Sequence, residues 1–343
     1  MLPRFLFALI FIVISGCAAV EPVPFRDNKV DAVWPAPPNQ PRVRFLREIK
    51  GPDEIIPAKG KVQRFVDLVT GEKRSMMEFA TPYGIITNGD FVIYVADPSA
   101  GVVHRYDLAK RDVTYIVQAG EEFLTSPVGV ALDREENLYV SDSVNAKVYK
   151  FNNSGEFIRE LKGTEDFQRP AGIAINSRSE KFVVDVLAQK LYVFDKDDGF
   201  VRDFPKVQSG EEMNSPSNVA IDHLDNVYVT DSMNFMVRVY DHEGNLKNNV
   251  GGIGDVPGFF ARPKGVALDS NQHIYVVDAN HDNFQIFDQE GRLLLFIGKN
   301  GVGPGEFYLP SGICIDKHDR IFITDTFNHR IQIFQYLKEG GKQ

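Results

Sequence analysis

Hydrophobic residues along this chain come in short runs that alternate with polar residues and end at turn-forming side chains. One type of run, as in residues 130–132, is followed directly by an aspartate or asparagine, here Asp133. A second run follows after a few polar residues, as in residues 138–140, and ends at an aspartate in every copy. Alternation with a period of two, bounded by turn residues, predicts β-strands. The aspartates that end the second run are Asp97, Asp142, Asp185, Asp231, Asp278 and Asp325.

The runs belong to a repeat that opens each time with a proline, and these prolines are 43 to 47 residues apart. Five of the six copies read Pro-x-Gly, and the fourth has Asn218 in place of the glycine. Repeats of this length are single structural units that bury their apolar faces on one another. Four strands per repeat predict an all-β fold, a six-bladed β-propeller with four antiparallel strands per blade. The prolines are Pro82, Pro127, Pro170, Pro216, Pro263 and Pro310.

The sixth repeat stops after its third strand, so the ring needs a strand from elsewhere. Residues 45–51 match residues 157–163 of the second repeat at almost every position. Residues 43–49 are therefore predicted to be the outer strand of the last blade. This strand would remove an edge that could otherwise pair with another chain. We expect the propeller to span residues 43–337, followed by a tail at residues 338–343.

The repeat resembles the NHL family of propeller repeats. Its sixth copy carries the triplet Asn-His-Arg at residues 328–330, ahead of an alternating strand, as that family does. The resemblance covers roughly residues 43–336 and implies a six-bladed ring that binds its ligand on one face. Two copies depart from the pattern, because residues 99–101 and 187–189 replace the triplet.

The chain begins with an apolar stretch that is too short to span a bilayer. Residues 5–14 are apolar, and they lead into the sequence Ile-Ser-Gly-Cys that ends at Cys17. This region resembles the lipobox of bacterial lipoproteins, which implies a signal peptide at residues 1–16 and acylation of Cys17. The alternative is an ordinary signal peptide that is cut after small residues.

Residues 17–42 hold six prolines and are predicted to form an extended, semi-rigid tether. Ala18, and not an aspartate, follows the cysteine. By resemblance to lipoproteins of Gram-negative bacteria, this implies the outer membrane. We therefore expect the protein in the bacterial cell envelope, attached to the membrane through its lipid anchor and facing the periplasm.

The chain carries a net charge of −9 and has no basic tract. This charge, together with export, argues against nucleic acid as a partner. Two cysteines are present, Cys17 and Cys314. If Cys17 is acylated, no disulfide can form. Cys314 lies at the small position of an inner strand and is expected to be a buried, inert thiol. We expect a monomer.

The six aspartates that end the second strands have two interpretations. They could ring a metal or polar ligand, or each could accept backbone hydrogen bonds that hold the turn after it. The structural role is favoured, because a residue that occurs in every blade serves the blade. The seven histidines lack the close spacing of a zinc motif. We therefore expect no cofactor and no metal site. A Ca²⁺ or Zn²⁺ ion is expected only if the protein is the enzyme described below as the alternative.

The turns between second and third strands are expected to share one face with the loops between blades. Aromatic, methionine and arginine residues are frequent there, as in binding surfaces. Alternatively, the aromatic loop residues tuck between the blades. An insertion at residues 52–80 starts on this face, and residues 62–69 have the apolar spacing of a short amphipathic helix. The residues expected to form the ligand-binding face are Arg169, Arg262, Lys264, His281, Asn328, His329 and Arg330.

These features favour a non-catalytic binding scaffold whose partner is a protein, peptide or glycan of the cell envelope. The alternative is an enzyme of the propeller lyase or lactonase kind, with Ca²⁺ or Zn²⁺ on the axis. Such a site needs several carboxylate, amide or imidazole groups at the mouth of the channel. The residues after the six prolines include neither a carboxylate nor an imidazole, and one is a cation. They are Tyr83, Val128, Ala171, Ser217, Lys264 and Ser311.

Overall fold

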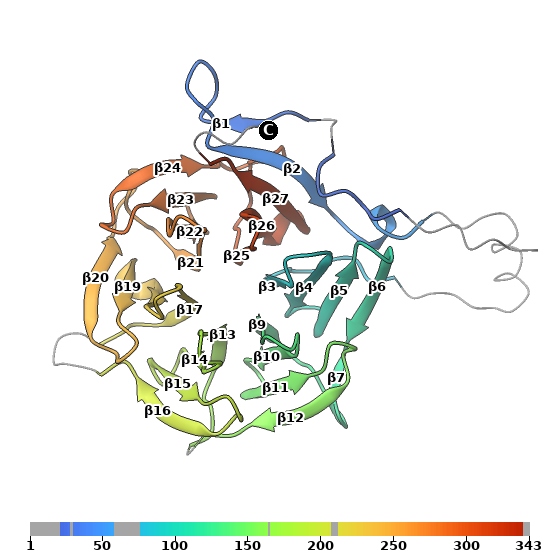
Figure 1. Cartoon of the computed structure of the whole chain (residues 1–343), viewed down its shortest axis with the longest axis vertical. Coiled ribbons are helices and arrows are strands. Elements are labelled where there is room, and N and C mark those ends of the chain that lie inside the picture. Colours follow the sequence, from blue (N-terminus) through green and yellow to red (C-terminus); the bar gives the residue numbers. More distant parts are fainter. Residues whose placement is uncertain (1–20, 28–29, 58–75, 164, 207–211, 339–343) are drawn as a thin grey trace, which may run out of the picture.

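The structure is a computed structural model, and six sheets stand around its central axis to form a closed six-bladed β-propeller (Figure 1). The predicted fold class is therefore confirmed. The predicted signal peptide, Cys17 and the predicted amphipathic segment lie outside the described residues. Within the described part of the chain, no helix is long and apolar enough to cross a membrane. The described residues are 21–27, 30–57, 76–163, 165–206 and 212–338.

Blades one to three each consist of four antiparallel strands in sequence order, and the first strand lies nearest the axis. Every residue of the second strand of blade two is buried. A continuous apolar run suits a strand that neighbouring blades cover on both faces. The strands are β3 Ile85–Thr87, β4 Val92–Asp97, β5 Val102–Asp107 and β6 Asp112–Ile116; β9 Pro127–Leu132, β10 Leu138–Asp142, β11 Lys147–Phe151 and β12 Phe157–Leu161; and β13 Pro170–Ile175, β14 Lys181–Asp185, β15 Lys190–Phe194 and β16 Phe200–Phe204.

Blades four and five repeat this arrangement, whereas blade six takes its outer strand from the N-terminal segment and gains a fifth strand, β1. The strands are β17 Pro216–Ile221, β18 Val227–Asp231, β19 Met236–Tyr240 and β20 Leu246–Gly251; β21 Pro263–Leu268, β22 Ile274–Asp278, β23 Asn283–Phe287 and β24 Leu293–Ile297; and β25 Ile313–Ile315, β26 Arg320–Asp325, β27 Arg330–Tyr336, β2 Val43–Ile49 and β1 Val33–Trp34. The short elements beside these blades are β7 Gln118–Ala119, β8 Glu122–Phe123 and the 3-10 turns η1 Pro52–Glu54, η2 Ser232–Asn234 and η3 Thr326–Asn328.

The ring closes where β2 pairs with β27. The two strands run antiparallel, from Val43 opposite Tyr336 to Ile49 opposite Ile331. The strand that closes the last blade therefore has the bounds predicted from the sequence. Without it, β27 would present an unpaired edge to other chains.

The described residues before β2 do not stand free as the expected tether. β1 pairs with β2, which adds a strand that the sequence did not predict. Further upstream, the side chain of Val23 is buried, and its N–H donates to the carbonyl oxygen of Leu108 in blade one at 2.9 Å. We call residues 21–27 the N-terminal arm. The arm docks because Val23 and Phe25 are apolar and find cover at the junction of blades six and one, whereas proline content alone suggests an open chain.

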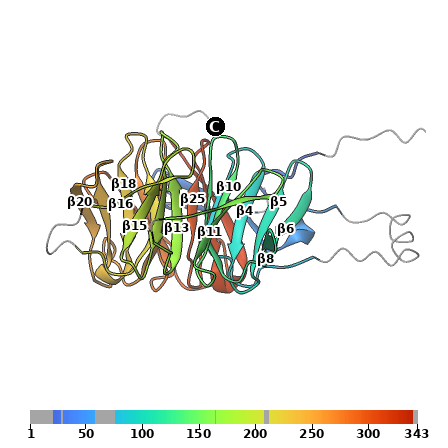
Figure 2. The same ribbon diagram turned by 90° about the horizontal axis from the view of Figure 1, so that it is seen from below.

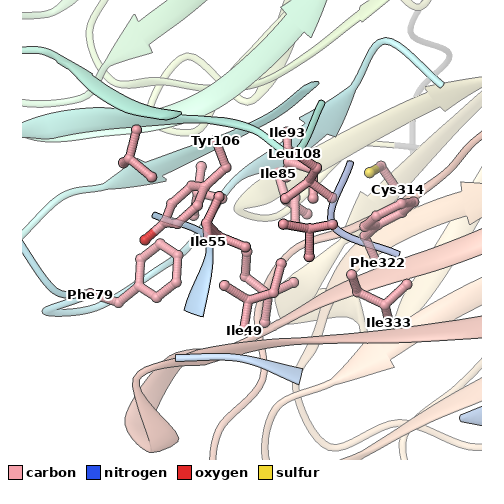
Figure 3. Packing of buried hydrophobic residues seen from close by; sticks show 14 of the residues in the cluster. Ile49, Ile55, Phe79, Ile85, Ile93, Tyr106, Leu108, Cys314, Phe322 and Ile333 are labelled. Atoms are coloured by element: carbon pink, nitrogen blue, oxygen red, sulfur yellow. The ribbon is translucent and has the colours of Figure 1, made fainter. Parts of the chain in front are cut away.

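Three parts of the chain fill the junction of blades six and one (Figure 3). Ile49 and Ile55 come from the N-terminal segment, Tyr106 from blade one, and Phe322 and Cys314 from blade six, and all are buried. Burial raises the pKa of the Cys314 thiol above its ordinary value. The closing junction is therefore packed as an interior, in the same way as the junctions between consecutive blades.

We predict that Phe45→Ala destabilises the protein by about 3 kcal/mol or more, because it removes a large buried ring from the closing strand. Phe45 is 4 % exposed and meets the ring of Phe334 edge-on, with 5.6 Å between the centroids. Ile158→Ala on outer strand β12 is the control, because Ile158 is 42 % exposed. Denaturant unfolding measures both variants. Equal stability of the two variants would contradict the role of β2 in closure.

Candidate binding face

Two kinds of loop lie on one face of the propeller, which we call the loop face. It carries the inter-blade loops and the turns between second and third strands. Backbone hydrogen bonds join the two kinds: the N–H of Val186 donates to the carbonyl of Arg169 at 3.0 Å, and that of Ala279 to the carbonyl of Arg262 at 3.0 Å. In Figure 2 the loop strand β8 lies near the lower edge of the disc, on this face. The opposite face carries the remaining turns.

Each blade aspartate ties a turn to the inter-blade loop before it. The buried carboxylate of Asp278 accepts the N–H groups of Ala261 and Arg262 at 2.7 and 3.0 Å. It also accepts those of Asn280 and His281 in the turn, at 3.1 and 3.2 Å. The sequence suggested only the bonds within the turn. The bonds to the loop arise from residues 16 and 17 positions earlier in the chain, so they appear only once the blade is folded.

Burial acts to raise the pKa of Asp97 and Asp325, and the partners of these two blade aspartates differ. In Asp97 the nearby His104, whose Nε2 lies 3.5 Å away, and the N–H groups of the inter-blade loop outweigh burial and lower the pKa. In Asp325 burial outweighs the donors, including Arg330 at 2.8 Å, and the pKa is raised. In both blades the carboxylate is fully buried and faces protein donors.

Arg330 is not part of the ligand-binding face, contrary to the prediction. Its residue is 1 % exposed. The guanidinium pairs with Asp325 and with Glu48 of the closing strand, and it donates to the carbonyls of Gly303 and Glu306 at 3.0 and 2.8 Å. Its donors are thereby used within the protein, so Arg330 fastens the last inter-blade loop and β2 to β27.

Two of the predicted arginines are exposed, but the structure does not bring them together. Arg169 precedes blade three and Arg262 precedes blade five, so blades three and four lie between them along the chain. Lys264 lies at the mouth of the central channel, where its Nζ is 3.2 Å from the hydroxyl of Tyr83 and 5.6 Å from the centroid of that ring. These cations do not form one positive site.

The remaining predicted residues bind neighbouring loops. The Nδ1 atom of His281 is 3.2 Å from the carboxylate of Asp278. Asn328 donates to a carbonyl of the adjacent inter-blade loop at 2.8 Å. His329 is exposed, and its Nδ1 lies 2.6 Å from the carbonyl oxygen of Ala80. The loop face is therefore more firmly bonded, and less cationic, than the sequence suggested.

The central channel is a cavity of about 260 Å³ lined mainly by isoleucine, valine, leucine and alanine from the first strands. Neighbouring inner strands approach so closely at the Pro-x-Gly motif that a side chain cannot be accommodated. A Cβ atom at Gly129 would collide with the carbonyl oxygen of Ala171, and one at Gly312 with that of Tyr83. The channel is therefore narrow at the level of these motifs.

The lining of the channel does not fit a divalent metal. Hard cations need several oxygen ligands, and zinc needs carboxylate, imidazole or thiolate groups that converge. The lining residues include no carboxylate and no imidazole, and the thiol of Cys314 stands alone among them. Nor does any group of three or more histidine, cysteine, aspartate or glutamate side chains in the described residues have the arrangement of a metal site.

The loop face is distinguished instead by exposed apolar residues. Aromatic and methionine residues were expected on this face, whereas Val144, Leu187 and Phe327 were not. The second residue after each blade aspartate is the exposed tip of its turn, and in four of the six blades this tip is large and apolar. We call the large apolar residues exposed on this face the apolar collar. They are Phe123, Val144, Leu187, Met233, Ile253, Val256, Phe259, Val302, Tyr308 and Phe327.

Both expectations for the aromatic loop residues hold, each for different side chains. Phe260 and Phe307 are fully buried between blades, whereas Phe123, Phe259 and Tyr308 are exposed. The exposed rings belong to the collar, and Tyr308 meets Phe327 at a centroid distance of 5.5 Å. Large apolar side chains that gather on one exposed face are typical of interaction sites.

The opposite face has few such residues. Among its described turns, Phe91 and Leu224 are the large apolar residues with exposed side chains, and Phe91 stacks on Phe25 of the N-terminal arm at 5.8 Å. The difference between the faces could have been found in the sequence. Aligning the repeats on the blade aspartates places Val144, Leu187, Met233 and Phe327 in one column.

A comparison with known protein families independently supports the fold. The chain belongs to the DUF5128 family, described as a 6-bladed beta-propeller, whose model matches residues 92–204, 208–284 and 268–341. No curated protein matches the chain significantly.

Solved propellers share the fold at low sequence identity. An auxiliary nutrient binding protein from Bacteroides thetaiotaomicron is 15% identical with a TM-score of 0.61, covering 76% of this chain and 70% of that one. A gluconolactonase from Xanthomonas campestris is 15% identical, with a TM-score of 0.58 and coverage of 76% and 87%. Virginiamycin B lyase from Staphylococcus aureus is 11% identical, with a TM-score of 0.58 and coverage of 77% and 85%. Proteins with this fold thus include binding proteins and enzymes. The fold alone does not distinguish the two functions, so the chemistry of the site has to.

We predict that Asp278→Ala lowers the free energy of unfolding by about 3 kcal/mol, because it leaves several backbone N–H groups of the loop and turn without an acceptor. Asp255→Ala is the matched control, since Asp255 belongs to the same loop and its side chain is fully exposed. Thermal and denaturant unfolding measure both variants. If Asp278→Ala is as stable as the control, the carboxylate does not hold the loop face together.

Proposed function

We propose that this protein is a non-catalytic binding scaffold whose loop face captures a partner in the cell envelope. The observation that carries the proposal is the apolar collar, because it gathers large apolar side chains on one face and leaves the opposite face almost without them. Folding does not require these side chains to be exposed, and water contact makes each of them unfavourable unless a partner covers it.

A protein or peptide suits the collar better than a glycan. Leu187, Met233 and Val144 offer aliphatic surface without hydrogen-bond donors, which matches apolar side chains. Methionine and aromatic residues are enriched at the centres of protein interfaces. Sugars need hydrogen bonds beside an aromatic ring, and among the collar residues the exposed pair Tyr308 and Phe327 combines two rings with a hydroxyl group. The nutrient-binding propeller among the structural neighbours agrees with a binding role.

We also propose that the blades are NHL-type repeats and that the protein is a lipoprotein of the outer membrane that faces the periplasm. The support is the resemblance of the repeat and of the residues before Cys17 to those two families. The lyase or lactonase alternative has no support in the channel, because the residues that line it are mainly apolar and include no carboxylate or imidazole for an axial Ca²⁺ or Zn²⁺.

We predict that replacing Leu187, Met233 and Phe327 together by serine weakens peptide binding at least about tenfold, because each loses roughly 1 kcal/mol or more of apolar burial. A random peptide library displayed on phage selects ligands for the wild-type protein, and fluorescence anisotropy measures their affinities. Leu224→Ser is the control, since Leu224 is similarly exposed on the opposite face.

The two arms of this experiment give distinct outcomes. Peptides that bind the wild type and the control equally, but not the triple variant, support the collar. Loss of binding in Leu224→Ser, or unchanged binding in the triple variant, contradicts it. On a glycan array, selective binding that survives the triple substitution would replace a protein or peptide partner by a sugar.

We predict that Cys17→Ser abolishes labelling by radioactive palmitate and leaves the protein soluble or uncleaved, because the acyl chains attach through the Cys17 sulfur. Fractionation of cells that express either form measures the attachment. Since each buried methylene contributes about 0.8 kcal/mol, several acyl chains suffice for a stable anchor. Cys314→Ser is the control, and its buried thiol should not affect labelling. Palmitate labelling that persists in Cys17→Ser would rule out this anchor.

A further inference from the structure

We propose that the propeller lies on its membrane with the opposite face toward the bilayer and the loop face directed away from it. The inference rests on the lipid anchor at Cys17 proposed above, and it adds which surface meets the lipid and which stays free for a partner. What carries it is the place where the N-terminal arm docks on the ring.

The arm docks at the opposite-face end of the junction between blades six and one. The N–H of Val23 donates to the carbonyl of Leu108, the first residue after β5, and Leu108 in turn donates to the carbonyl of Phe91 at 2.9 Å. Phe91 precedes β4, in the turn between the first two strands of blade one. These turns belong to the opposite face, so the chain enters the ring there.

Several contacts hold the arm in this place. The guanidinium of Arg320 lies 3.6 Å from the centroid of the Phe25 ring, a close cation–π contact. Phe25 also packs on Phe91 at 5.8 Å. Arg320 is itself fixed to blade one, because it donates to the carbonyl of Gly89 at 2.7 Å. Arg47 of β2 donates to the carbonyl of Pro24 at 2.9 Å. The arm is therefore a fixed part of the ring.

The docked arm makes the remaining link to the anchor short. Six residue steps separate Cys17 from Val23, which reach at most roughly 20 Å when fully extended. The tether predicted from residues 17–42 would have reached several times farther. Blade strands of five or six residues span about 17–20 Å between the faces. The lipid can thus sit beside the opposite face with slack, but it reaches the plane of the loop face only by full extension along the rim.

The opposite face has the chemistry of a surface that meets hydrated headgroups without inserting. Its exposed turn residues carry charges of both signs, and the exposed apolar side chain of Leu224 stands among them. The apolar collar, in contrast, points away from the bilayer, so a partner reaches it from the periplasmic side. The charged residues in these turns include Arg134, Glu135, Glu136, Arg178, Glu243 and Lys317.

The test measures the distance of four labelled positions from the lipid surface. The full-length lipidated protein is placed in vesicles of phosphatidylethanolamine and phosphatidylglycerol that contain an acceptor dye on the headgroups. Lys110→Cys and Ser99→Cys mark the opposite-face and loop-face ends of β5, close to the arm. Leu224→Cys and Met233→Cys mark the corresponding ends of β18, across the ring. Only the introduced thiol takes the donor dye, because Cys17 carries the lipid and Cys314 is buried.

We expect energy transfer to be stronger from Lys110→Cys than from Ser99→Cys, and stronger from Leu224→Cys than from Met233→Cys. The reverse order in both pairs would place the loop face on the membrane and overturn the proposal. Equal transfer within each pair, strong near the arm and weak across the ring, would mean that the disc stands on its edge and would also overturn it. Flotation separates these outcomes from a failed anchor, since protein that does not float with the vesicles contradicts lipidation itself.

A variant of the arm tests the cause. Phe25→Ser should release the arm and lengthen the link, so the differences within both pairs shrink while the protein still floats with the vesicles. Phe157→Ser is the matched control, because Phe157 is a half-exposed ring on the outer strand of blade two, away from the arm. Circular dichroism checks that both variants fold. Unchanged differences in folded Phe25→Ser would show that the docked arm does not orient the ring.

Discussion

The pairing of β2 with β27 is the interaction on which the rest of the structure depends. It completes the sixth blade and removes the last open strand edge, and Arg330 reinforces it by joining Glu48 to Asp325 at the loop face. Because β2 comes from the N-terminal segment, closing the ring also fixes where that segment lies. β1 and the docked arm follow from the same constraint, since both come shortly before β2 in the chain.

A second constraint acts in every blade and explains the character of the loop face. Each buried aspartate binds the backbone of the inter-blade loop and a group of the turn. Asp278 does so through the N–H groups of Ala261 and His281, and Asp325 through the N–H of Tyr308 and the side chain of Asn328. The backbone of this face is thereby held, while the residue at the tip of each turn is exposed. Apolar residues at four of these tips form a surface that a partner can cover, while the channel beneath is narrow and apolar.

The repeat period and the alternation of apolar residues were sufficient to predict the blades, their strands and the closing strand at residues 43–49, because these features depend on local pattern. The docked arm was not predictable in the same way. Its contacts join Phe25 to Arg320 and Val23 to Leu108, which are far apart in the sequence. Arg330 was expected at the surface because its position in the repeat adjoins a turn. In the structure it is buried, because its guanidinium binds acceptors from three separate segments of the chain. Part of the collar was expected from the aromatic and methionine residues of the loops. The rest, at Val144, Leu187 and Phe327, becomes visible when the repeats are aligned on the blade aspartates.

Native-state hydrogen exchange of the amides in β2 tests most directly whether the N-terminal segment is an integral part of the ring. The comparison strand is β12, the outer strand of blade two, which the chain supplies in sequence order. We expect the hydrogen-bonded amides of β2 to exchange as slowly as those of β12 and β27, through unfolding of the whole ring. Exchange in β2 that is orders of magnitude faster than in β12, through local opening, would contradict closure by this strand and the fixed placement of the arm.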